Sequence, residues 1–141
     1  MKIKILYTME EDKRKHLEFI QNVIARMNSN SFMIKGWVVT LVSALFALIA
    51  SGKFEKELFY VSYLIIILFW ILDGYFLSKE RQYRGLYKTV AKKKNDIDFN
   101  MNVSEYNKEK NTWISSIFSE TFRVFFGLLI IITSIIYSFI N

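Results

Sequence analysis

The chain has 141 residues, of which 52% are hydrophobic and 23% are charged, with a net charge of +6 and no proline or cysteine. The lack of cysteine excludes disulfide scaffolds, thiol nucleophiles and cysteine-based metal sites, and a single histidine excludes zinc sites built from several histidines. Apolar and charged residues are segregated along the chain, and this segregation indicates how the chain is organised.

Three long apolar runs, residues 34–51, 58–77 and 124–140, predict three transmembrane helices. The third run can be extended backwards through Arg123 and Phe122. A water-soluble fold of this length could not bury three helices that are apolar on every side. We therefore expect an all-α membrane protein with three transmembrane helices and long cytoplasmic helical extensions.

The positions of lysine and arginine predict the orientation. Six precede the first run and a seventh, Lys35, lies at its start; nine lie within residues 78–121, whereas the loop between the first two runs has two lysines balanced by two glutamates. By the positive-inside rule, the N-terminus is cytoplasmic and the C-terminus lies outside. The chain then divides into a cytoplasmic strand and amphipathic helix (1–33), two transmembrane helices (34–77), a basic cytoplasmic segment (78–121) and a third transmembrane helix (122–141).

Ahead of the first run, apolar residues recur at helical spacing. They are Leu17, Ile20, Ile24, Met27 and Ile34. No glycine interrupts this stripe before Gly36, so we expect one helix to continue into the first span. Its partner would be the second apolar stripe, formed by Tyr83, Leu86, Tyr87, Val90 and Ala91, either in the same chain or in another subunit. The single histidine, His16, is expected on the solvated surface.

Two short segments, residues 2–7 and 97–103, alternate with a period of two. Such alternation predicts β-strands, and we expect the two segments to pair as a small two-stranded element, within or between chains. Beyond them, Asn111 and Thr112 are expected to begin a helix that leads through Trp113 into the third span.

Asp73 is the most informative ionisable residue, because charged groups inside spans are costly and face a partner or a pore. It could pair with Lys35 or Arg123, which open the first and third spans, or it could form a ring at a pore mouth that favours cations. Small and hydroxyl residues on the first and third spans either allow close helix packing or line a pore. The pore or gate candidates are Asp73, Lys35, Arg123, Thr40, Ser43 and Ser134.

A basic stripe with neighbouring tyrosines follows the second span. Its members are Arg81, Arg84, Lys88, Lys92, Lys93, Tyr83 and Tyr87. These residues suit anionic lipid headgroups, or an anionic ligand such as a nucleotide or single-stranded DNA. No catalytic, metal or cofactor motif is visible, so we expect neither an enzyme nor a cofactor.

The segment HLEFIQNVIARMNSNSFMIKGWVVTLVSALFALIA (16–50) resembles short bacterial membrane effectors encoded beside nucleotidyltransferase-type anti-phage genes. These are effectors of the Hailong type and, more loosely, SLATT effectors. The resemblance implies a tetrameric pore in the bacterial inner membrane, held closed by a nucleotide-derived ligand or a partner enzyme and opened on infection to depolarise the cell. The alternatives are a non-conducting membrane scaffold for a cytoplasmic enzyme, or a holin-like lysis protein.

Overall fold

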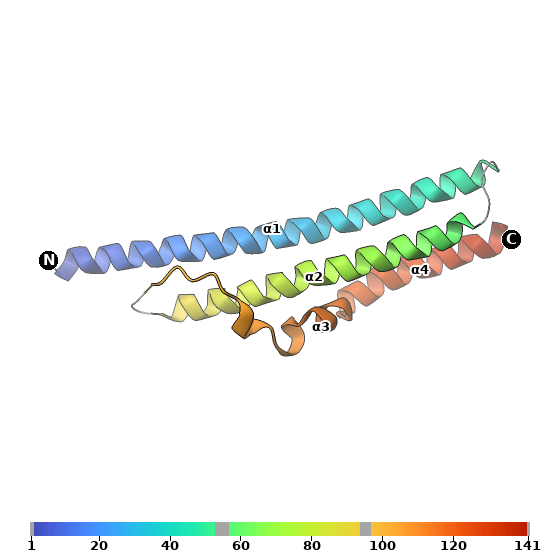
Figure 1. Ribbon diagram of the computed structural model, residues 1–141. Helices are drawn as coiled ribbons and strands as arrows, with labels where there is room; N and C mark the ends of the chain where they lie inside the picture. Colours follow the sequence, from blue (N-terminus) through green and yellow to red (C-terminus); the bar gives the residue numbers. More distant parts are fainter. Residues whose placement is uncertain (1, 53–56, 94–96, 141) are drawn as a thin grey trace.

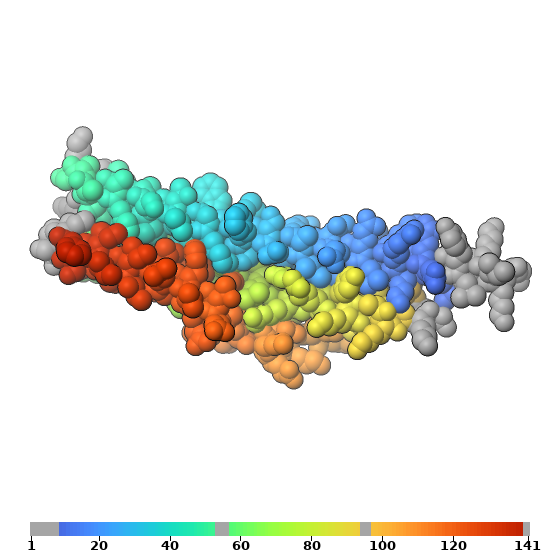
Figure 2. Space-filling view, turned by 180° about the vertical axis from the view of Figure 1, so that it is seen from behind, coloured from blue at the N-terminus to red at the C-terminus, as the bar shows by residue number. Residues whose placement is uncertain are grey.

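The computed structural model describes residues 2–52, 57–93 and 97–140, and it is a long rod of helices (Figure 1). The elements are α1 (Lys2–Ala50), α2 (Leu58–Lys92), two short 3-10 turns (Ser104–Tyr106 and Glu109–Asn111), α3 (Trp113–Ile117) and α4 (Glu120–Ile140). Helix α4 lies beside only one half of the rod (Figure 2). The other half, called the stem here, consists of residues 9–33 of α1 and 78–92 of α2.

Helices α1 and α2 form an antiparallel hairpin along the whole of α2. At the stem end, the Lys13 ammonium donates to the carbonyl oxygens of Ala91 and Lys93 at 2.7 and 2.8 Å. At the opposite end, the rings of Phe46 and Phe59 lie 5.6 Å apart. The chain has no proline to break either helix, which allows this length.

The apolar stripe on the stem is buried against its own chain. Ile20 and Ile24 of α1 form a core cluster with Leu86 and Val90 of α2. Of the two expected partners, the structure therefore has the one in the same chain.

Helix α4 packs antiparallel to α2 in the half away from the stem. The Trp70 and Phe126 rings stack at 5.6 Å, and further along the hydroxyls of Tyr63 and Ser134 are hydrogen-bonded at 2.8 Å. Helix α1 joins the same core through Val38, which is fully buried. The three long helices therefore share one apolar core.

Within the described residues, α1, α2 and α4 are each long and apolar enough to cross a membrane, as the apolar runs predicted. In each of these helices, no more than 28% of the 18-residue apolar stretch is buried inside the chain. Outward residues such as Leu64, Leu128 and Ile131 are more than half exposed. An apolar surface of this extent needs a covering, and the fold therefore fits a membrane protein.

The prediction of two paired strands is wrong for the part of the chain that the structure describes. Residues 2–7 belong to α1, because extending an existing helix adds one hydrogen bond for each residue fixed. Residues 97–103 have no regular structure. Here the side-chain oxygens of Asp98, Asn100 and Asn102 accept hydrogen bonds from the backbone N–H two residues further on, at 2.9–3.2 Å. These local bonds replace a strand ladder.

The alternation in residues 97–103 instead reflects packing on the stem. Val103 is buried in the cluster of Ile20 and Leu86. The Phe99 ring lies 5.4 Å from the ring of His16. His16 is 1% exposed, contrary to the expected solvated position, and its Nε2 lies 3.2 Å from the Asn100 carbonyl oxygen. The Asp and Asn side chains of the segment therefore accept bonds from its own backbone, and the alternating apolar side chains cover the stem.

Residues 97–119, called the return segment here, run back along α2 toward α4 (Figure 1). Two glycines of α2 make room for it. A Cβ atom on Gly85 would meet the Tyr106 ring at 2.6 Å, and one on Gly74 would clash with the Ile117 side chain and lie 3.2 Å from its Cα atom. The two glycines therefore allow the return segment to contact the α2 backbone closely.

Polar side chains of α2 bind the return segment between these glycines. The Ser78 hydroxyl donates to the Asn111 carbonyl at 2.7 Å. The Gln82 amide, which is 1% exposed, donates to that carbonyl and to the side-chain oxygen of Asn107. These bonds satisfy backbone groups that lie outside the long helices.

Replacing Gly74 by alanine should destabilise the fold by displacing α3. We expect Gly74→Ala to have a free energy of unfolding about 1–3 kcal/mol below that of Gly127→Ala, because overpacking costs this much. Both variants gain the same helix propensity, and a Cβ on Gly127 would meet nothing within 4 Å. Unfolding of the purified proteins in detergent measures the difference, and equal stabilities would contradict close docking of α3.

Candidate functional site

A buried ion pair lies where the stem meets the apolar half of the rod. The Asp73 side chain is fully buried, and one of its carboxylate oxygens lies 2.5 Å from the Lys35 ammonium. Its other oxygen accepts a hydrogen bond from the Ser31 hydroxyl at 2.5 Å, and Lys35 also donates to that hydroxyl at 2.8 Å. Ser31, Lys35 and Asp73 are called the ion-pair cluster here.

The ion-pair cluster involves all three long helices. Ser31 and Lys35 are four residues apart, so they lie on the same face of α1, opposite Asp73 of α2. The Phe122 ring of α4 covers the cluster, with its centroid 4.4 Å from the Lys35 ammonium. A cation at this distance from a ring is attracted by the ring quadrupole. Each helix thus contributes a group that compensates the buried charges.

The structure pairs Asp73 with Lys35 rather than with Arg123. Arg123 is exposed and forms no ion pair among the described residues. Of the two alternatives for Asp73, the structure therefore has the ion pair within the chain. A ring of Asp73 residues at a pore mouth stays a prediction.

The remaining pore candidates lie away from the cluster. Thr40 and Ser43 are exposed on α1, and the Thr40 hydroxyl donates to the Gly36 carbonyl at 2.9 Å. Ser134 is exposed on α4 and is bonded to Tyr63. The small and hydroxyl residues of α1 form one face that neither α2 nor α4 covers. This face, called the α1 face here, comprises Gly36, Thr40, Ser43, Ala44 and Ala47.

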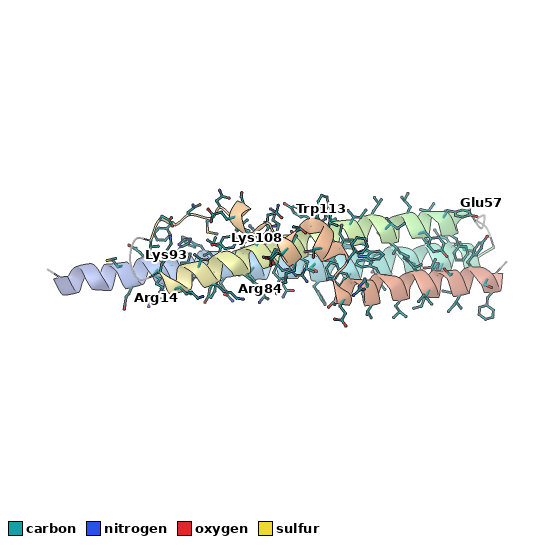
Figure 3. The ribbon with its side chains drawn as sticks, turned by 90° about the horizontal axis from the view of Figure 1, so that it is seen from below. Arg14, Glu57, Arg84, Lys93, Lys108 and Trp113 are labelled. Carbon is teal, nitrogen blue, oxygen red and sulfur yellow. The ribbon has the colours of Figure 1, made fainter. Side chains whose placement is uncertain are left out.

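Part of the predicted basic stripe lines a groove between α2 and the return segment, with a volume of about 290 Å³. Four cationic residues line this basic groove: Arg81, Arg84, Lys88 and Lys110. Arg84 lies between Lys93 and Trp113 along the rod (Figure 3). Lys110 lies 22 residues beyond Lys88 in the sequence, and only the docking of the return segment brings the two together.

The groove cations differ in how far their charge is already compensated. Arg81 donates to the Lys110 carbonyl at 2.6 Å, which positions it in the groove wall. Arg84 forms an ion pair with Glu80 at 2.7 Å, but its side chain is 59% exposed. Lys88 is exposed and has no hydrogen-bond or ion-pair partner within the described chain. Lys110 is also exposed, and its ammonium group has no such partner among the described residues. An anion entering the groove would therefore meet Lys88, Lys110 and the outer edge of Arg84.

The other predicted ligand residues occupy different positions. Lys93 pairs with Asp98 at 3.5 Å, and Lys92 is exposed but does not line the groove. The Asn100 amide, and secondarily Lys93, holds the pKa of Asp98 below its usual value. Tyr83 and Tyr87 are half-buried against the stem core.

Of the two tyrosines, Tyr87 also reaches a neighbouring hollow, which it lines together with Arg84 and Lys88. Only Tyr87 is therefore placed to stack on a ligand held by the groove cations. The described residues contain no cluster of histidine, aspartate and glutamate that could hold a metal ion.

No protein-family model, curated protein or solved structure matches the chain.

Removing the Ser31 hydroxyl should destabilise the protein, because it leaves a buried Asp73 oxygen without its donor. We expect Ser31→Ala to lower the free energy of unfolding by about 1–3 kcal/mol. Ser43→Ala is the matched control on an exposed part of the same helix and should stay within about 0.5 kcal/mol of the original protein. Unfolding in detergent measures both, and a neutral Ser31→Ala would show that the hydroxyl is dispensable.

Proposed function

We propose that the chain is the subunit of a homo-oligomeric channel in a bacterial cell membrane, opened or closed by an anionic ligand at the stem. The observation that carries the proposal is the uncovered α1 face. It holds the hydroxyls of Thr40 and Ser43 beside Gly36, Ala44 and Ala47, on a helix that is otherwise apolar at this level.

Such a face suits contact with further copies of the chain. Small residues permit close approach of helix backbones in a membrane, where association relies on van der Waals packing. Three helices cannot enclose a water path alone, whereas α1 helices arranged around a symmetry axis can. Thr40 and Ser43 would then provide a weakly polar lining, and the ion-pair cluster would remain inside each subunit.

The stem supplies a mechanical link between a ligand and the spans. Helices α1 and α2 continue without interruption from the stem core into the apolar half. A ligand that draws Arg84 and Lys88 outward would rotate or shift α2 against α1. The ion-pair cluster lies where the stem meets the apolar half, so such a movement would have to stretch or break its bonds.

The ligand class follows from the charges of the basic groove. Four cations with one half-buried tyrosine beside them suit a phosphate-bearing molecule with a base to stack, such as a nucleotide or a short single strand. On the positive-inside rule the groove faces the cytoplasm. Opening would depolarise the membrane, as the resemblance to anti-phage effectors implies.

The proposal predicts a conductance that responds to an oligonucleotide. The purified protein in planar bilayers should conduct ions, and a short single-stranded DNA should change that conductance. Arg84→Glu with Lys88→Glu should abolish the response while leaving conductance intact, because it reverses two of the three exposed charges of the basic groove.

Lys92→Glu with Lys79→Glu is the control, since it makes the same change in net charge on α2 outside the groove. Equal loss of response in both double variants would indicate a general charge effect. Absence of conductance with and without DNA, together with a monomeric mass in detergent, would refute the channel and leave the membrane scaffold.

A further inference from the structure

We infer that α3 lies in the headgroup layer of the membrane and anchors the return segment to the lipid bilayer through three apolar side chains. These are Trp113, Ile114 and Phe118, which are 46%, 71% and 61% exposed. They are called the α3 face here. The inference rests on the membrane insertion contained in the proposed function, and it adds a lipid contact that the three long apolar runs do not include.

The α3 helix is fixed to α2 by both of its ends. The Trp113 indole N–H donates to the Ile71 carbonyl at 2.9 Å, and the Trp70 indole N–H donates to the Ile117 carbonyl at 2.8 Å. Ile117 fills the space above Gly74. The position of α3 along the rod is therefore defined by α2 residues from Trp70 to Gly74.

That position lies at the edge of the apolar part of α2. The apolar run of α2 ends at Leu77, six residues beyond Ile71, which is about 9 Å along the helix. Ser78 and Arg81 follow immediately and bind the carbonyls of Asn111 and Lys110. The return segment thus makes polar contacts beside the polar part of α2. Its apolar outward face, at α3, lies beside the apolar part of α2.

The outward side of α3 is apolar, although within the described chain only the rings of Tyr75 and Trp70 flank it. Its inward residues are Ser116, which is fully buried and contacts Arg81, and Ile117. In water, this orientation would leave three large apolar side chains exposed within six consecutive residues without compensation. In the interface, a tryptophan whose N–H is bonded and whose ring is apolar is at its preferred depth.

A lipid covering agrees better with the surroundings than a second copy of the chain. The helix α4 begins two residues after Phe118, and its outward residues Val124 and Leu128 are 66% and 54% exposed. The Trp70 ring lies 6.5 Å from that of Phe118 and 5.6 Å from that of Phe126 of α4, so the α3 face lies beside the apolar surface that α4 presents. The cations Arg81 and Lys110 stand on its polar side, where anionic lipid headgroups would lie.

Spin-label accessibility tests this placement, and the absence of native cysteine makes single labelling clean. A nitroxide is attached at Ile114→Cys, with Leu128→Cys as a reference in the α4 span and Lys108→Cys as a reference on the polar part of the return segment. The full chain is reconstituted in phosphatidylethanolamine and phosphatidylglycerol vesicles. Collision rates with oxygen, which enters lipid, and with a water-soluble nickel complex are measured.

We expect the ratio of oxygen to nickel collisions at Ile114 to be severalfold above that at Lys108 and below that at Leu128. A high nickel rate at Ile114 would place α3 in water, and low rates for both reagents would mean that protein covers it. Either result would overturn the inference. A label at Leu128 that is itself accessible to nickel and not to oxygen would instead refute membrane insertion, and with it the proposed function.

Discussion

The burial of one carboxylate constrains the rest of this fold. Asp73 is fully buried in an otherwise apolar stretch of α2, so its charge must be compensated where it lies. Lys35 and Ser31 of α1 provide that compensation, and the Phe122 ring of α4 covers the lysine. These contacts set the register of α1 against α2 and place α4 beside both. An apolar seam alone would tolerate sliding by a turn, whereas a buried ion pair does not.

The same register explains why the stem and the return segment fit together. With Asp73 opposite Lys35, Ile20 and Ile24 come opposite Leu86 and Val90 and form the stem core. Glycines at positions 74 and 85 then leave one side of α2 open for the return segment. The basic groove exists because that docking brings Lys110 to Arg81 and Lys88. The basic groove and the ion-pair cluster are therefore consequences of one helix hairpin.

Sequence periodicity predicted the long helices well, because apolar runs and an uninterrupted stripe are direct consequences of helix geometry. The positions of charged residues within the apolar runs also restricted the expected ion-pair partners of Asp73 to Lys35 and Arg123, because these residues lie at a similar expected depth. Periodicity failed at residues 97–103, where alternating Asp and Asn residues mimic a strand while bonding their own backbone. The burial of His16 was missed because the residues that cover it, Phe99 and Asn100, are more than 80 positions away in the sequence. Long-range docking of an irregular segment leaves no periodic signal, and Lys110 could not be assigned to the groove without it.

The helix expected from Thr112 into the third span is another instructive case. Thr112 does cap a helix, since its hydroxyl accepts from the Ser115 N–H at 3.3 Å. The helix ends at Ile117, and α4 begins at Glu120. Ile117 must reach Gly74 while Phe122 must reach Lys35, and the break between α3 and α4 allows both contacts. Tertiary packing therefore overrides a local preference that the sequence expresses clearly.

A charge exchange between Lys35 and Asp73 tests the central claim that this pair holds the hairpin in register. We expect Lys35→Asp and Asp73→Lys each to lower the free energy of unfolding in detergent by about 3–5 kcal/mol, because each buries unpaired like charges. The double variant should recover most of that loss, since it restores an opposite pair at the same place. Single variants as stable as the original protein, or an exchanged pair no more stable than the weaker single variant, would contradict the account.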